Sequence, residues 1–238
     1  MIVGSSLRGD VEREVSIDLE RERLAGTLAL PKDARGLVLF AHGSGSSRLS
    51  SRNRYVARVI NSQRIGTLLF DLLTAEEEAL DRFTGELRFD IPFLAARLVG
   101  VTHWVASRAD TRGLKIGYFG ASTGAAAALI AAGQLSDLVS AVVSRGGRPD
   151  LAEEALRLVH APTLLIVGGD DEPVITMNRK ALAKLYCAGK KLVIIPGATH
   201  LFEEPGALEQ VARLAAAWFT EHFENAAQHQ LRPASGFK

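Results

Sequence analysis

Residues 114–119, Leu114-Lys115-Ile116-Gly117-Tyr118-Phe119, run directly into Gly120-Ala121-Ser122-Thr123-Gly124, and this stretch decides the fold. The first six residues form a nearly continuous apolar run, which is typical of a strand buried on both faces. The next five place a serine between two glycines, and an alanine-rich stretch of helical length, 124–132, follows. A buried strand that turns tightly into a helix is the repeating unit of a parallel sheet covered by helices.

The rest of the chain repeats this alternation of strand and helix. Short apolar runs that predict further buried strands occupy 36–41, 67–70, 141–143, 163–167 and 191–195. Amphipathic stretches of helical length occupy 54–62, 91–107, 151–159, 177–186 and 206–223. Near the start, 14–20 and 24–30 read as two antiparallel strands. We therefore expect an α/β fold, a three-layer α/β/α sandwich around a mostly parallel sheet.

No internal repeat and no linker divides the chain, so we predict a single domain over residues 1–224. Residues 225–238 are polar, with a proline and a glycine, and are expected to form a flexible tail. The acidic segment 74–81 and its continuation to Asp90 interrupt the alternation. We predict that 74–90 forms a mobile surface loop beside the sheet.

Composition excludes several classes of protein. The chain has 28 Lys and Arg against 27 Asp and Glu, and no run of basic residues, so we expect no nucleic-acid partner. The single cysteine, Cys187, cannot form an internal disulfide or a multi-cysteine metal site, and we expect it to pack at a helix end. The charged start lacks the apolar core of a signal peptide, and no apolar run is long enough to span a bilayer. We therefore expect a cytoplasmic protein that does not bind membranes.

The G-x-S-x-G pattern around Ser122 has the features of a nucleophile elbow. A serine nucleophile must project from a tight, strained turn, and small residues on either side let the neighbouring backbone pass. The turn also places the Thr123 N–H at a helix start, where an unpaired donor can bind a developing oxyanion. The alternative is a glycine-rich turn in which Ser122 only caps the helix.

A loop of small residues, His42-Gly43-Ser44-Gly45-Ser46-Ser47, follows the predicted strand 36–41. We place the second oxyanion-binding N–H on Ser44, with Gly43 as the alternative. We expect His42 to orient the loop by hydrogen bonding rather than to act as a base. A plain turn or an anion-binding nest would produce the same loop sequence.

A serine nucleophile needs a base and a carboxylate that orients the base. Two later strand ends supply them: 163–167 leads into a loop with Asp170 and Asp171, and 191–195 leads into Gly197-Ala198-Thr199-His200. His200 is the histidine that follows a late strand and precedes the final helix, so we predict it to be the base. Between the two carboxylates we favour Asp171, and Asp170 stays open.

In these residues the chain resembles the α/β-hydrolase superfamily and, within it, the small, cap-free members of the dienelactone hydrolase-related group. The resemblance covers about residues 14–223 and rests on the four loops described above. It implies a sheet of roughly eight strands and the hydrolysis of esters or related acyl bonds without a metal or an organic cofactor. It also implies that Ser122 is the nucleophile, His200 the general base and acid, and Asp171 the orienting carboxylate. The enzymes after which the group is named use a cysteine at the elbow, whereas this chain has Ser122. The resemblance therefore does not imply that this chain acts on their lactone substrate.

The site is expected to be open. One short helical segment follows Arg145-Gly146-Gly147-Arg148, which leaves no room for a cap domain, so 74–90 is the only candidate cover. We name Gly43 and Arg145 as candidate substrate-binding residues. An acidic or phosphate-bearing substrate stays open because further cations, Arg48, Arg52, Arg54 and Arg148, lie in the same loops and near them; the alternative is that these arginines pair with carboxylates or cap helices. Asp71, at the end of a strand, is expected to fix loops by hydrogen bonding.

The predicted function is that of a carboxylesterase-like serine hydrolase acting on small or medium acyl esters or thioesters. The expected partner is a small-molecule acyl substrate, and a homo-oligomer stays open. One alternative is transacylation or peptide hydrolysis on the same triad. Another is a non-catalytic, ligand-binding member of the fold.

Overall fold

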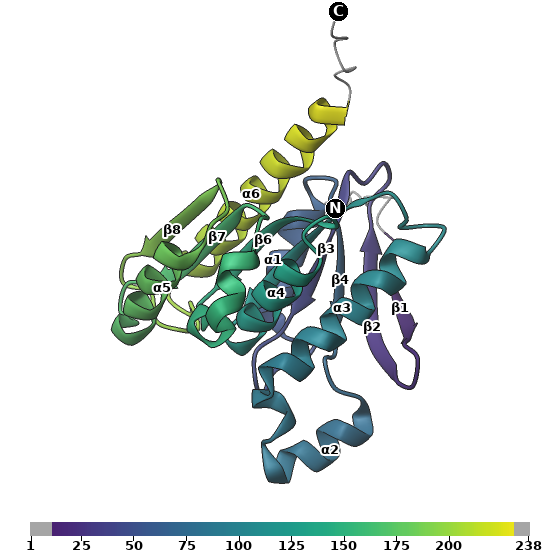
Figure 1. The fold of residues 1–238 in the computed structure, drawn as a ribbon, viewed down its shortest axis with the longest axis horizontal. Helices are drawn as coiled ribbons and strands as arrows, with labels where there is room; N and C mark the ends of the chain where they lie inside the picture. Colours follow the sequence, from purple (N-terminus) through teal and green to yellow (C-terminus); the bar gives the residue numbers. More distant parts are fainter. Residues whose placement is uncertain (1–10, 231–238) are drawn as a thin grey trace, which may run out of the picture.

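The computed structural model describes residues 11–230 and contains an eight-stranded sheet (Figure 1). The strand order is β1-β2-β4-β3-β5-β6-β7-β8. β2 runs antiparallel to both β1 and β4, and all the other neighbouring pairs are parallel. The strands are β1 Val11–Asp18, β2 Arg23–Leu30, β3 Gly36–Ala41, β4 Gly66–Phe70, β5 Lys115–Ala121, β6 Val139–Arg145, β7 Thr163–Gly168 and β8 Lys190–Ile195. The mostly parallel α/β fold predicted from the sequence is confirmed.

Helices cover both faces of this sheet. One face packs against α1 (Ser51–Asn61) and α6 (Ala207–Gln230), and the opposite face packs against α3 (Ile91–Ser107), α4 (Thr123–Gln134), the 3-10 segment η2 (Pro149–Leu158) and α5 (Glu172–Lys184). Adjacent residues of a strand point to opposite faces, so Leu39 joins the core on the α3 and α4 side while Phe40 joins the core under α1 and α6. This burial on both sides explains the continuous apolar runs in the sequence.

The segment 74–90 is not the mobile loop that we predicted. It forms a helix, α2 (Ala75–Thr84), and a 3-10 turn, η1 (Leu87–Phe89), and α2 stands away from the sheet in Figure 1. Thr74 and Glu77 form a capping box at the start of α2, and Gly85 ends the helix in the left-handed conformation. The prediction was wrong because α2 has no apolar stripe: Leu80 and Phe83 are both exposed.

The final helix is longer than expected. α6 continues to Gln230, so the predicted tail 225–238 begins inside this helix, and residues 231–238 lie outside the described residues. Within the described part of the chain, no helix combines the length and the apolar character that a bilayer crossing needs. Cys187 is buried, as predicted, and its thiol lies 3.6 Å from the Gly189 carbonyl oxygen.

Candidate active site

Ser122 occupies the sharp turn between β5 and α4. Its backbone is in a strained conformation, with φ 49° and ψ −121°, which a non-glycine residue keeps only where its surroundings enforce it. The turn runs so close to β3 that a Cβ added at Gly124 would lie 2.2 Å from the Ala41 carbonyl oxygen. Only glycine fits there. The elbow is therefore fixed by backbone packing as the sequence pattern predicted.

The small-residue loop after β3 lies directly against this turn. A Cβ added at Gly43 would lie 3.0 Å from the Cβ of Ser122. The Ser44 N–H donates a hydrogen bond of 3.0 Å to the Thr123 hydroxyl oxygen. Thr123 is the first residue of α4, so its own N–H has no acceptor within the helix. The structure thus brings together Ser122 and the residues predicted to bind the oxyanion, with the Ser44 N–H engaged by the Thr123 side chain.

His42 ties the loop to the end of β4. Its Nδ1 lies 3.0 Å from the Gly43 carbonyl oxygen, and the Leu72 N–H donates to its Nε2 over 3.1 Å. Because a carbonyl only accepts, Nδ1 carries the proton, Nε2 is the acceptor, and the imidazole is neutral. Burial, which disfavours the charged form, lowers the pKa of His42 below its usual value, although the Gly43 carbonyl and Asp71 oppose this. His42 therefore positions the loop, as predicted.

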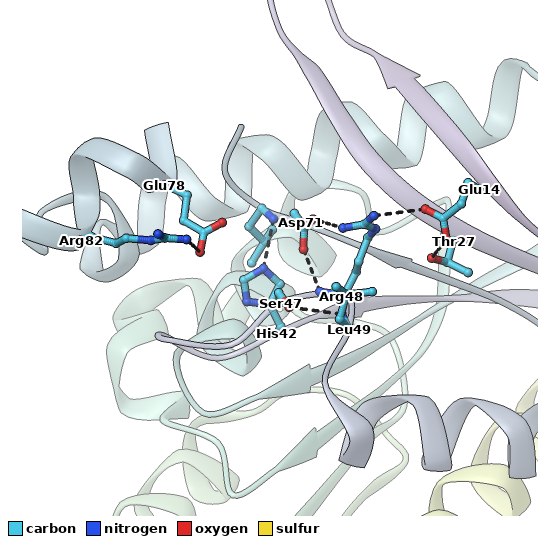
Figure 2. A network of polar contacts seen from close by, with 10 residues as sticks. Glu14, Thr27, His42, Ser47, Arg48, Leu49, Asp71, Glu78 and Arg82 are labelled. Carbon is cyan, nitrogen blue, oxygen red and sulfur yellow. Dashed lines mark hydrogen bonds and ion pairs between the residues drawn. The ribbon is translucent and has the colours of Figure 1, made fainter. Parts of the chain in front are cut away.

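Asp71 anchors the other end of the same loop. Its carboxylate accepts hydrogen bonds from the Arg48 backbone N–H, at 2.7 Å, and from the Arg48 guanidinium, at 2.8 Å. Figure 2 shows that Arg48 extends from Asp71 to Glu14 on β1. Its Nη2 donates to Oε2 of Glu14 over 3.2 Å. Asp71 thus fixes loops, as expected, and Arg48 is occupied by two carboxylates.

His200 and Asp171 meet at the carboxyl ends of β7 and β8. The Nδ1 of His200 lies 2.7 Å from Oδ2 of Asp171. Asp171 directly precedes α5, and its side chain is mostly buried, whereas Asp170 is exposed. The Asp170 N–H donates to the Ala198 carbonyl oxygen over 3.0 Å and so joins the two loops through the backbone. Of the two carboxylates that the sequence left open, Asp171 is the one that contacts His200.

Ser122 and His200 both border the end of β6. The Ser122 N–H donates to the Arg145 carbonyl oxygen over 3.3 Å, and a Cβ added at Gly146 would lie 3.5 Å from Cε1 of His200. Within residues 11–230, no hydrogen bond joins the Ser122 hydroxyl to the His200 ring. The three predicted catalytic residues therefore lie around one short segment, with the Asp171–His200 contact already made.

A cavity of about 240 Å³ opens beside the oxyanion loop. One wall is the loop itself, including Gly43, and neither Ser122 nor His200 is among the residues that line this cavity. The other wall comes from the β4 exit, α2, η1 and α3, and its residues include Leu72, Leu73, Asp81, Arg88 and Leu94. The Asp81 carboxylate accepts from the Leu87 N–H and from Arg88 Nε, at 2.7 and 2.6 Å, and so holds η1 against α2.

The predicted substrate-binding arginines differ in their partners. Arg52 pairs with Glu203, Arg54 with Glu12 and Arg148 with Asp150. Arg145 is buried, and among the described residues its guanidinium makes no hydrogen bond and no ion pair. Its guanidinium carbon lies over the ring of Phe202, 5.9 Å from the ring centre.

Comparison with known proteins shows the family of this chain. The model of the dienelactone hydrolase family matches residues 58–229. The chain belongs to the dienelactone hydrolase family. A crystal structure of a dienelactone hydrolase from Anabaena variabilis is 58% identical to this family member, covers 90% of it and 99% of its own chain, and superposes with a TM-score of 0.89. Est1E from Butyrivibrio proteoclasticus, 18% identical over 89% of this chain and 99% of its own, shares the fold with a TM-score of 0.74.

This dienelactone hydrolase family member also has longer relatives. A putative phosphoribosyl transferase of Mycobacterium tuberculosis is 56% identical over 212 residues, which are 89% of this chain and 46% of the relative. The chain therefore spans about half the length of these curated relatives.

The wall of the cavity formed by α2 and η1 was not predicted from the sequence. Asp81 and Arg88 lie in the segment predicted as a loop, and their contact depends on α2 and η1 being ordered. Two signals for this order were present in the sequence: Thr74 with Glu77 three residues later, and Gly85 at the end of the helix.

Proposed function

We propose that this protein is a serine esterase that hydrolyses small or medium acyl esters or thioesters through an acyl-enzyme on Ser122. The single observation that carries the proposal is the convergence of the strained Ser122 elbow with the His200–Asp171 pair around the end of β6. A strained serine next to a histidine with a bound carboxylate is the arrangement that nucleophilic acyl transfer requires.

In the proposed reaction, His200 Nε2 accepts the Ser122 proton as the hydroxyl oxygen attacks the acyl carbon. His200 then donates this proton to the leaving alcohol or thiol, and the acyl-enzyme forms. Water next attacks the acyl carbon while His200 accepts its proton, and His200 then returns this proton to the Ser122 oxygen as the bond to the acyl group breaks and the free acid leaves. Asp171 stays ionised, holds the imidazole with the proton on Nδ1, and stabilises the imidazolium.

The oxyanion would bind at the Thr123 N–H and at the oxyanion loop. Because the Ser44 N–H donates to the Thr123 hydroxyl, the oxyanion takes this donor only if the Thr123 side chain turns away. Gly43, the alternative in the same loop, already lies against Ser122. Either arrangement places backbone donors beside the developing charge, where they cost no reorganisation of solvent.

The cavity between the oxyanion loop and α2 would receive the acyl chain. Its volume of about 240 Å³ is below the range of roughly 300–1,000 Å³ that is typical of sites for drug-sized ligands. Leu72, Leu73 and Leu94 line it. These features favour a short aliphatic chain over a fatty acid.

Steady-state hydrolysis of 4-nitrophenyl esters tests the proposal. We expect turnover of the acetate and butyrate esters, a sharp fall at longer chains, and loss of turnover in Ser122→Ala and His200→Ala. Adding a primary alcohol as a competing acceptor separates hydrolysis from transacylation, because a transacylase forms the new ester in preference to the acid. Folded wild-type protein that hydrolyses none of these esters would favour the ligand-binding alternative.

A further inference from the structure

The side-chain hydroxyl of Thr123 lies beside the nucleophile with its proton unused. Thr123 follows Ser122 directly, and only 5% of the residue is exposed. Its Oγ1 accepts the Ser44 N–H over 3.0 Å, but among the described residues the hydroxyl proton has no acceptor. A hydroxyl both accepts and donates, and a buried donor without a partner is unfavourable. The Thr123 O–H therefore lacks an acceptor next to the atom that would attack the substrate.

The start of α4 explains why this proton is unused. Inside a helix, a threonine hydroxyl usually donates to a carbonyl of the preceding turn. Thr123 is the first residue of α4, so no preceding helical turn supplies such a carbonyl. The proton thus stays available to a group that enters the site.

The hydroxyl also lies where an oxyanion is expected to form. The N–H of Ser44 and the N–H of Thr123 are the two backbone donors predicted to bind the oxyanion, and Thr123 Oγ1 accepts from the first of them. The second donor and the hydroxyl belong to the same residue and are joined only through its Cα and Cβ. An oxyanion on the Thr123 N–H would therefore form within reach of the Thr123 O–H.

Rotation of the side chain away from this place is unfavourable. Threonine is β-branched, so its Oγ1 can occupy only a few staggered positions. Any other position would break the bond to the Ser44 N–H and leave two polar groups without partners at a buried residue. The observed rotamer is thus the one that we expect the substrate to meet.

The bond from Ser44 makes the hydroxyl a better donor. In a chain of hydrogen bonds each bond polarises the next, so an N–H that donates to a hydroxyl oxygen strengthens donation by the O–H. A donor that is already oriented also costs no reorganisation when charge develops on the substrate. The Ser44 N–H would then stabilise the oxyanion through the hydroxyl rather than by direct contact.

From these observations we propose that the Thr123 side-chain hydroxyl is a catalytic oxyanion donor, held in place by the Ser44 N–H. This inference rests on the esterase function proposed above and adds one group to its reaction. As Ser122 attacks, the carbonyl oxygen gains the electron pair of the broken C–O π bond and accepts a hydrogen bond from the Thr123 O–H. The hydroxyl keeps its own proton, and the proton of Ser122 still passes to His200.

Valine and serine at position 123 give opposite results for the two roles that the hydroxyl could have. Thr123→Val keeps the branched shape, removes the hydroxyl and frees the Ser44 N–H. Loss of one oxyanion donor typically lowers kcat about 10²- to 10³-fold, and the freed N–H compensates in part, so we expect kcat/KM for 4-nitrophenyl acetate to fall about 10- to 100-fold. Thr123→Ser keeps the hydroxyl and should stay within about fivefold of wild type. If the hydroxyl only blocked the Ser44 N–H, Thr123→Val would be faster than wild type, and the proposal would be overturned.

Thr102→Val is the matched control for the loss of a buried threonine hydroxyl. The Thr102 hydroxyl lies on α3, 2.7 Å from the Leu98 carbonyl oxygen and 2.6 Å from the Tyr118 hydroxyl oxygen. Its removal should lower the melting temperature but leave kcat/KM within about twofold of wild type. A loss of activity as large as that of Thr123→Val would assign both effects to destabilisation and overturn the proposal.

A trifluoromethyl ketone measures binding of the oxyanion directly. The Ser122 oxygen bonds to the ketone carbon, the Ser122 proton passes to His200, and the ketone oxygen becomes the negatively charged oxygen of a hemiketal. Titration followed by fluorine NMR should show an affinity that falls in Thr123→Val by about the same factor as kcat/KM and is largely kept in Thr123→Ser. Equal affinity in wild type and Thr123→Val would contradict the hydroxyl donor.

Together, the two measurements separate this inference from the esterase proposal. Wild-type protein that hydrolyses no ester, yet binds the ketone more tightly than Thr123→Val does, would support the hydroxyl donor and overturn the esterase. Ester hydrolysis at equal rates in wild type and Thr123→Val would overturn the hydroxyl donor alone. Equal losses in Thr123→Val and Thr123→Ser would also overturn it, because they would assign the effect to packing of the side chain. Wild-type protein that neither hydrolyses an ester nor binds the ketone would overturn both.

Discussion

The Nδ1 of His200 lies 2.7 Å from Oδ2 of Asp171, a contact between loops that follow β7 and β8. The two residues are 29 positions apart in the chain, and the pairing of β7 with β8 brings them together. This contact fixes which ring nitrogen faces the carboxylate and so leaves Nε2 for the nucleophile.

Asp171→Asn should therefore lower kcat about 10³- to 10⁴-fold, because an amide no longer stabilises the imidazolium or selects the correct tautomer. The steady-state rate on 4-nitrophenyl butyrate measures this loss. Asp170→Asn is the matched control, since Asp170 is exposed and its contact to Ala198 uses only the backbone. A larger loss in Asp170→Asn than in Asp171→Asn would reverse the two assignments.

Gly43→Ala should reduce kcat about 10-fold or more, because displacing the nucleophile by a fraction of an ångström is costly. The added Cβ would lie 3.0 Å from the Ser122 Cβ and 3.2 Å from the Ala121 carbonyl oxygen. Gly100→Ala makes the same change on α3, where the neighbour is the flexible side chain of Leu19, and should leave kcat within about twofold. Unchanged kcat in Gly43→Ala would mean that the loop is free to move away from Ser122.

Wild-type protein should lose stability in acid partly through His42. The unfolded chain binds a proton at His42 near the usual pKa of 6.5, whereas the folded protein, with its lowered pKa, binds it only at lower pH. The contribution of neutral His42 to the free energy of unfolding is thus complete above pH 6.5 and decreases as the pH falls from 6.5 toward the folded-state pKa.

Melting curves of wild type and His42→Gln, recorded at about pH 7.5 and about pH 5.5, isolate this term. Other titrating groups act equally in both proteins, so wild type should lose more melting temperature across this range than His42→Gln. Equal losses would show that His42 is protonated as readily in the folded protein as in the unfolded chain.

Asp81→Asn should loosen the α2–η1 wall of the cavity. The variant loses the charged contact to Arg88, and we expect a fall of about 1.5–3 kcal/mol in the free energy of unfolding, measured by chemical denaturation. It should also raise KM for butyrate more than for acetate esters, because the longer acyl chain reaches this wall. Glu78→Gln removes an exposed pair with Arg82 and should cost less than about 1 kcal/mol. A similar cost in both variants would argue against an ordered wall.

Local sequence patterns predicted the parts of the fold that depend on local physics. The apolar run into Ser122 required only the strand period and the steric needs of a tight turn, and both are visible in a dozen residues. The order of Ser122, Asp171 and His200 at strand ends followed from the topology of parallel sheets.

Long-range contacts set the limits of sequence prediction. Asp170 and Asp171 are adjacent and chemically identical, so only the position of His200 in space distinguishes them. The wall at Asp81 was missed because α2 is held by caps and by ion pairs with Arg88 and Arg97 rather than by an apolar face. The lack of a partner for Arg145 was equally hidden, since Arg52 and Arg54 differ from it in having partners that are distant in the chain, Glu203 and Glu12.

The most direct test of the central claim is the intact mass of the protein after incubation with a fluorophosphonate. This reagent modifies a serine only when a neighbouring base activates it. We predict one adduct per wild-type chain, none on Ser122→Ala, and far slower labelling of His200→Ala. An unmodified, folded wild-type protein, or an adduct that persists in Ser122→Ala, would contradict the assignment of Ser122 as the activated nucleophile.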